Sequence, residues 1–139
     1  MTLPIYYTHK VKGKQVKILV GLNKYERMHH QPRNKMKQYY YDLIGKSLNK
    51  IPIKGKVKTE YTYYYKNSQS DAPNVVAVID KMFMDALQEY GIIKEDNVSN
   101  YIGSSWCVGG QDKLNPRIEV RVIEQIEEVK ENVNQGSLL

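Results

Sequence analysis

Three aspartates and one lysine in the second half of the chain have spacings that suit phosphodiester hydrolysis. Asp71 lies just before a segment with helical periodicity, and Asp96 lies just after it. Within that segment Lys81 and Asp85 are four residues apart, which places them on one helix face. If the three carboxylates converge, they suit Mg²⁺, which needs few protein ligands because it keeps several waters. Bound Mg²⁺ polarises a phosphodiester, and a neighbouring lysine stabilises the negative charge of the transition state.

The same residues also fit a purely structural interpretation. Asp71 would then begin the helix, and Asp96 would lie in a solvated turn. Lys81 would pair with Asp85 on the surface. Other chemistries have less support, because the sequence contains no GxGxxG, Walker, HExxH or GxSxG pattern. The single cysteine, Cys107, follows a tryptophan in an expected strand and suits a buried structural thiol rather than a nucleophile.

The elements that must position these residues follow from hydrophobic periodicity. Alternation and turn residues predict strands over 6–12, 15–20, 57–66, 98–108 and 117–123, the last two connected through Gly109-Gly110. Helical spacing predicts helices over 33–48 and 73–90. Pro73 suits the first position of the second helix, and Gly91 suits the position just after its end. We therefore expect an α+β fold, with a small mixed sheet and two main helices packed on one side.

The chain of 139 residues is the size of one domain, and we assign residues 1–124 to it. Residues 125–139 are acidic and rich in amides, which predicts a helical or disordered tail. No apolar run approaches the length of a membrane span, and the start of the chain has no apolar secretory segment. One cysteine cannot form a disulfide framework. We therefore expect a soluble, cytoplasmic protein with no membrane partner.

Charge is distributed unevenly between the two halves of the chain. Residues 1–66 contain fifteen Lys or Arg against three acids, a net charge of +12, whereas residues 67–139 contain six against twelve, a net charge of −6. Ten of the twelve tyrosines also lie before residue 66. A basic surface with interspersed aromatic rings is typical of polyanion binding. The alternative is ordinary solvation of a small domain by its lysines.

Several short segments, taken in order, resemble one known family, the RusA family of Holliday junction resolvases. The likeness spans residues 16–123 and is strongest over residues 71–120. The segments are Leu22-Asn23-Lys24-Tyr25, Asp71-Ala72-Pro73-Asn74-Val75, Asp80-Lys81-Met82-Phe83-Met84-Asp85-Ala86-Leu87, Gly91-Ile92-Ile93, Glu95-Asp96-Asn97, Gly109-Gly110-Gln111-Asp112-Lys113 and Asn115-Pro116-Arg117-Ile118-Glu119-Val120. Proteins of this family are small and often encoded by phages or prophages, in which case the compartment would be the host cytoplasm.

This resemblance implies a homodimeric endonuclease that depends on Mg²⁺, or on Mn²⁺ in its place, and nicks four-way DNA junctions during recombination and repair. It implies catalytic roles for Asp71, Lys81 and Asp96. The metal would be bound by Asp71 and Asp96, with Asp85 in support, and Asn74 matches the asparagine of the family's D-x-D-N motif. The basic half would then contact DNA phosphates. The residues we assign to that contact are Lys24, Arg27, Arg33, Lys35 and Lys37.

One position departs from the family pattern. The second aspartate of D-x-D-N is replaced by Pro73, which has neither a carboxylate nor a backbone N–H. A second hypothesis is therefore a RusA-like protein that no longer cuts and acts instead as a DNA-binding factor or as a factor that binds a regulatory protein. A third is a nonspecific nucleic-acid binder of unrelated fold.

Overall fold

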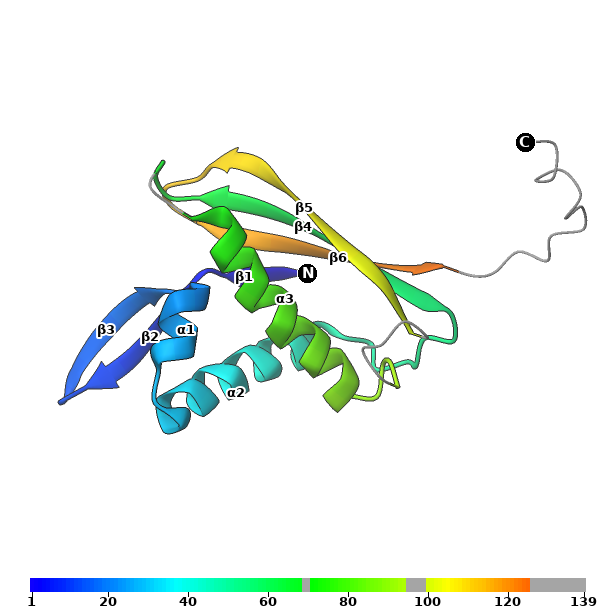
Figure 1. Ribbon diagram of the computed structural model, residues 1–139, viewed down its shortest axis with the longest axis horizontal. Coiled ribbons are helices and arrows are strands. Elements are labelled where there is room, and N and C mark those ends of the chain that lie inside the picture. Colours follow the sequence, from blue (N-terminus) through cyan, green and yellow to red (C-terminus); the bar gives the residue numbers. More distant parts are fainter. Residues whose placement is uncertain (69–70, 95–99, 126–139) are drawn as a thin grey trace, which may run out of the picture.

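The structure is a computed structural model that describes residues 1–68, 71–94 and 100–125 (Figure 1). Six strands and three helices lie within these ranges. In chain order they are β1 (Thr2–Pro4), β2 (Tyr6–Val11), β3 (Lys14–Leu19), α1 (Leu22–Arg27), α2 (His30–Ser47), β4 (Lys56–Tyr65), α3 (Ala72–Glu89), β5 (Tyr101–Gln111) and β6 (Arg117–Gln125). None of the helices in these ranges is both long enough and apolar enough to cross a membrane.

Four of the strands form one mixed sheet in the order β1-β6-β4-β5. β4 is parallel to β5 and antiparallel to β6, and β6 is antiparallel to β1. α3 connects the two parallel strands, so β4, α3 and β5 form a βαβ unit. Alternate residues of β4 are buried, whereas Lys58 on its other face is exposed. The helices therefore cover one face of the sheet, which confirms the predicted α+β class and mixed sheet.

Among the described elements α3 contributes the largest share of the core, because its apolar residues recur at helical spacing. Phe83 is fully buried and its ring meets that of Tyr61 edge to face, with centroids 6.4 Å apart. Gly91 ends the helix region with φ +72°, a backbone conformation that glycine adopts without strain. The predicted second helix and its glycine are thus confirmed. α2 joins the same core through Tyr40, whose hydroxyl donates to the Pro4 carbonyl at 2.6 Å.

The hairpin predicted around Gly13 is confirmed and forms a separate two-stranded sheet of β2 and β3. Lys12 and Gly13 both have positive φ, 50° and 78°, as the tight turn between two twisted strands requires. At the base of the hairpin Val20 N–H donates to the Ile5 carbonyl at 2.9 Å. Figure 1 shows that the hairpin extends away from the four-stranded sheet as an arm.

Three local features differ from expectation. β1 and α1 are short elements that the sequence pattern did not predict. β5 continues through the glycines to Gln111, where a connection was expected, and it pairs with β4 instead of β6. A Cβ on Gly109 would lie 2.6 Å from the Tyr64 ring, so glycine permits this close approach. Cys107 is exposed rather than buried, because it lies on the edge strand β5.

Candidate functional site

A stripe of charged residues runs along the side of α3 that faces away from the sheet. Lys81, Asp85 and Glu89 follow one another at intervals of four residues on this helix. Asp85 and Glu89 also line an open hollow of about 440 Å³, together with Gln88 and with Tyr41 of α2. The hollow is therefore shared between two helices, and the two carboxylates of the stripe lie on one face of α3. Sequence reasoning missed Glu89, although its spacing from Asp85 is a signal for it.

Tyr41 is the only residue of this hollow that comes from α2. Its phenol pKa is raised to about 12 by burial first, and then by electrostatic interaction with Asp85, with the Tyr25 phenol and with Glu89. The hydroxyl of Tyr90 donates to the Tyr41 carbonyl at 2.9 Å and holds this part of α2 against the end of α3. Tyr41 thus keeps its proton at neutral pH and presents a hydrogen-bond donor beside two carboxylates.

Tyr25 links the charged stripe of α3 to the basic helices. It lies on the short helix α1 and is only 4% exposed. The Lys81 ammonium nitrogen lies 5.5 Å from the centre of its ring, and the Arg33 guanidinium carbon lies 5.5 Å from the same centre. Cations at this distance are attracted to the ring. The lysine expected to be catalytic and an arginine expected to bind DNA therefore meet at one side chain.

The other expected DNA-binding residues lie on the same two helices, α1 and α2. Lys24 and Arg27 lie in the last turn of α1 and are exposed. On α2, Lys35 is exposed and Lys37 is half-buried. α1 and α2 contain one acid each, so both helices present mainly positive charge. The structure therefore brings the predicted basic residues to two neighbouring helices.

Asp71 lies elsewhere, at the N-terminal end of α3. Its exposed carboxylate accepts a hydrogen bond from the Asn74 side-chain amide at 2.6 Å. It makes no side-chain capping bond to the helix backbone. Pro73 is the second residue of α3, one position later than predicted, and lies in the first turn of the helix. The Asp71 and Asn74 pair is thus held together, as the expected motif requires, but at the end of the helix.

α3 keeps Asp71 and Asp85 of one chain apart, although both were expected near one metal ion. Fourteen residues at a rise of 1.5 Å each separate them by about 20 Å along the helix. Mg²⁺ binds its ligands at about 2.1 Å, so one ion cannot contact both in the same chain. Asp96, the third expected ligand, lies outside the described residues. Within residues 1–68, 71–94 and 100–125, no group of three or more His, Cys, Asp or Glu could hold a metal.

Asp80 faces the sheet instead of the hollow. It accepts a hydrogen bond from the hydroxyl of Tyr61 on β4, and a weaker one from Ser104 on β5 at 3.5 Å. Burial raises the pKa of Asp80, and the hydrogen bonds from Tyr61 and Ser104 oppose that rise. This carboxylate therefore connects α3 to both parallel strands, which is a structural role.

No protein-family model matches the chain, and no curated protein matches it. The function is therefore inferred from the residues themselves, and three regions matter for that inference. They are the stripe of α3, the basic surface of α1 and α2, and the exposed Asp71 with its Asn74 partner.

Proposed function

We propose that this protein is a RusA-like endonuclease that nicks four-way DNA junctions with the help of Mg²⁺. The observation that supports this most is the shared contact at Tyr25. Lys81 and Arg33 each lie 5.5 Å from the centre of its ring, so the charged stripe of α3 borders directly on the basic helices α1 and α2. A nuclease needs this adjacency, because the same phosphate backbone must be bound by cations and presented to carboxylates.

Two carboxylates of the stripe suit a magnesium ion. Asp85 and Glu89 share one helix face beside a hollow large enough for a hydrated ion. Mg²⁺ is commonly held by one or two carboxylates, with waters and substrate phosphates completing its shell. We therefore propose Asp85 and Glu89 as its protein ligands. When bound, the ion would polarise the phosphate and activate a water.

The remaining residues of the site have roles that follow from their charge. Arg33, with Lys24 and Arg27 nearby on α1, binds the DNA backbone and places a phosphate beside the stripe. Lys81 donates hydrogen bonds to the negative charge that builds up on that phosphate during cleavage. Tyr25 fixes the positions of both Lys81 and Arg33, so it is a positioning residue.

A dimer is part of the same proposal, because a four-way junction offers two symmetric strands to cut. β5 is the edge of the sheet that suits it. Among the described strands β5 pairs only with β4, and its eleven residues include no charged side chain. Trp106 and Val108 on it are 44% and 51% exposed. A second copy can pair there about a twofold axis without bringing like charges together, whereas edges that avoid pairing usually contain charges or proline.

The dimer can be tested with residues that the protein already has. Cys107 is the chain's single cysteine and lies on β5. A short bis-maleimide should crosslink two copies through it, and Ser105→Lys should prevent this by placing a charge on both strands. Gel-filtration mass should fall with the same variant. A wild-type protein that stays monomeric at micromolar concentration would remove the dimer from the proposal.

The nuclease is tested with a synthetic four-way junction labelled on each strand. Wild type should nick two opposite strands in Mg²⁺ and none in EDTA, and Asp85→Asn should reduce nicking about 100-fold or more. Glu60→Gln is the matched control, because it removes a carboxylate from the strand β4 without touching the stripe. Equal loss in both variants, or nicking in EDTA, would contradict the proposed site.

A second candidate function is a RusA-like factor that binds DNA or a regulatory protein without cutting. Pro73 favours it, because the family pattern has a carboxylate there and Asp71 stands apart from Asp85. This candidate predicts junction binding by wild type with no nicking in Mg²⁺ or Mn²⁺. If Pro73→Asp then gained nicking, the site of an ancestral enzyme would lie at the start of α3.

A further inference from the structure

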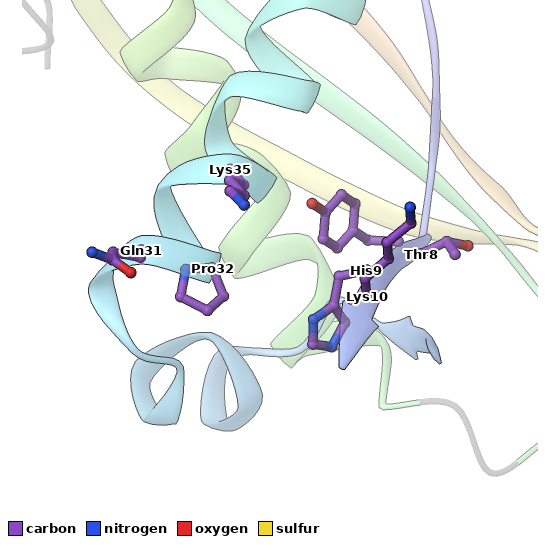
Figure 2. A pocket seen from close by; sticks show the side chains of 7 residues that line it. Thr8, His9, Lys10, Gln31, Pro32 and Lys35 are labelled. Carbon is purple, nitrogen blue, oxygen red and sulfur yellow. The ribbon is translucent and has the colours of Figure 1, made fainter. Parts of the chain in front are cut away.

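A second hollow lies between the hairpin arm and the beginning of α2. Its volume is about 350 Å³, at the lower end of the size range of sites for small organic ligands. Figure 2 shows its labelled residues, with those of β2 on one side and those of α2 on the other. The lining residues are Tyr7, Thr8, His9, Lys10, Gln31, Pro32 and Lys35.

The charge of this hollow is positive. Lys10 comes from β2 and Lys35 from α2, so the two ammonium groups belong to opposite walls. Among the described residues, no acid lines it. Glu26 is the only acid in the first 41 residues of the chain, and it belongs to α1. A phosphate group entering the hollow therefore meets positive charge from two sides and no nearby wall of opposite sign.

Aromatic rings form another part of the same wall. The rings of Tyr7 and His9 lie nearly parallel, at 12°, with centroids 6.1 Å apart. Tyr39 packs against Tyr7 at 5.3 Å and is itself 41% exposed. Proteins that bind single strands combine a positive groove with rings on which bases stack, and such stacking tolerates any sequence. Paired bases are less able to enter, because both of their faces are already covered in a duplex.

We propose that this hollow binds one nucleotide of unpaired DNA, with its phosphate between Lys10 and Lys35 and its base against His9. The proposal rests on the proposed function, since it takes DNA as the substrate. It adds a site that shares no lining residue with the hollow beside the charged stripe of α3, and a preference for the unpaired strand. The hairpin arm extends the same surface, because Lys12 and Lys14 lie exposed at its tip.

Binding of a fluorescent 12-nucleotide oligothymidylate tests this directly. Lys10→Gln with Lys35→Gln should weaken binding about tenfold or more and should reduce the slope of log affinity against log salt by about 0.7, the value for one lost phosphate contact on a single strand. Lys56→Gln with Lys58→Gln removes the same charge from β4 as a matched control. If the control variant shows the same fall in affinity and in salt slope, the hollow is not the nucleotide-binding site.

The ring is tested separately from the charge. His9→Ala should weaken oligothymidylate binding about fivefold or more without changing the salt slope, and His9→Phe should restore it, because stacking needs only a flat ring. Equal affinity of wild type for a 12-base-pair duplex and for the single strand would overturn the preference for unpaired DNA. A His9→Ala variant that binds oligothymidylate as wild type does would overturn the contact between the base and His9.

The nucleotide-binding hollow and the nuclease can fail independently of each other. A protein that binds oligothymidylate through Lys10 and Lys35 but never nicks a junction keeps this site and loses the nuclease. A protein that nicks the junction, with Lys10→Gln and Lys35→Gln binding oligothymidylate as wild type, keeps the nuclease and loses this site.

Discussion

Asp80 and Asp85 lie five residues apart on α3, and a helix that turns about 100° per residue points them about 140° apart. Asp80 faces the sheet, where Tyr61 and Ser104 donate hydrogen bonds to it. Asp85 faces the hollow that it shares with Tyr41 and Glu89. The same residue type on one helix thus serves the fold on one side and the proposed chemistry on the other. Which role each has is decided by the element opposite it.

The largest effect should come from the outer side of α3, the side of the charged stripe, where Lys81 lies one turn before Asp85. Lys81→Ala should reduce junction nicking about 100-fold or more, because it removes a donor to the charge that develops in the transition state. Thermal unfolding should stay close to wild type, since Lys81 is exposed. Lys81→Arg should recover part of the rate. A fall in melting temperature that matched the loss of activity would assign Lys81 to the fold and contradict a catalytic role for this side of α3.

On the inner side of α3, which faces the sheet, a substitution should lower stability and leave DNA binding unchanged. Asp80→Ala leaves the buried hydroxyl of Tyr61 without its partner, which should cost about 1–3 kcal/mol in the free energy of unfolding. Binding of junction DNA should be unchanged. Urea denaturation measures the loss, and Asp85→Ala is the control that should stay near wild type. Adding Tyr61→Phe to Asp80→Ala should recover part of the stability, because the unpaired hydroxyl is then gone.

The smallest effect is on the pH dependence of stability. The pKa of Asp80 is raised in the folded protein, so the folded state holds this proton more tightly than the unfolded chain. The resulting stability is present below the unfolded pKa of about 3.9 and is lost as pH rises through the folded pKa. Asp80→Asn should remove this contribution, so the variant should gain relative to wild type between pH 4 and pH 7. The measurement is the unfolding free energy of Asp80→Asn minus that of wild type at each pH. A difference that stays constant with pH would show that Asp80 titrates as it does in water.

Much of the fold could be predicted because its main elements have strong local patterns. α3 has an apolar face with Pro73 at its start and Gly91 after its end, and β4 alternates buried and exposed residues. β1 could not be predicted, because it has three residues and pairs with β6 at the other end of the chain. α1 has six residues with only Tyr25 buried, which is too short for periodicity to appear. The position of β4 between β5 and β6 depends on contacts distant in sequence.

The candidate site was predicted less well than the fold. The i,i+4 spacing of Lys81 and Asp85 was informative, and the same rule would have added Glu89. A site in which Asp71 and Asp85 of one chain both contact one ion could have been ruled out from the sequence, because a helix of this length holds its ends far apart. The contact of Tyr25 with both Lys81 and Arg33 was not predictable, since it joins three helices and only one of them has strong periodicity.

The most direct test of the site is the binding of Mn²⁺, used as a paramagnetic substitute for Mg²⁺ and followed by electron paramagnetic resonance. Wild type should bind the ion, and Asp85→Asn and Glu89→Gln should each weaken that binding about tenfold or more, while Asp71→Asn should leave it unchanged. Loss of binding in Asp71→Asn, with Asp85→Asn and Glu89→Gln binding as wild type, would contradict a metal site on the outer side of α3.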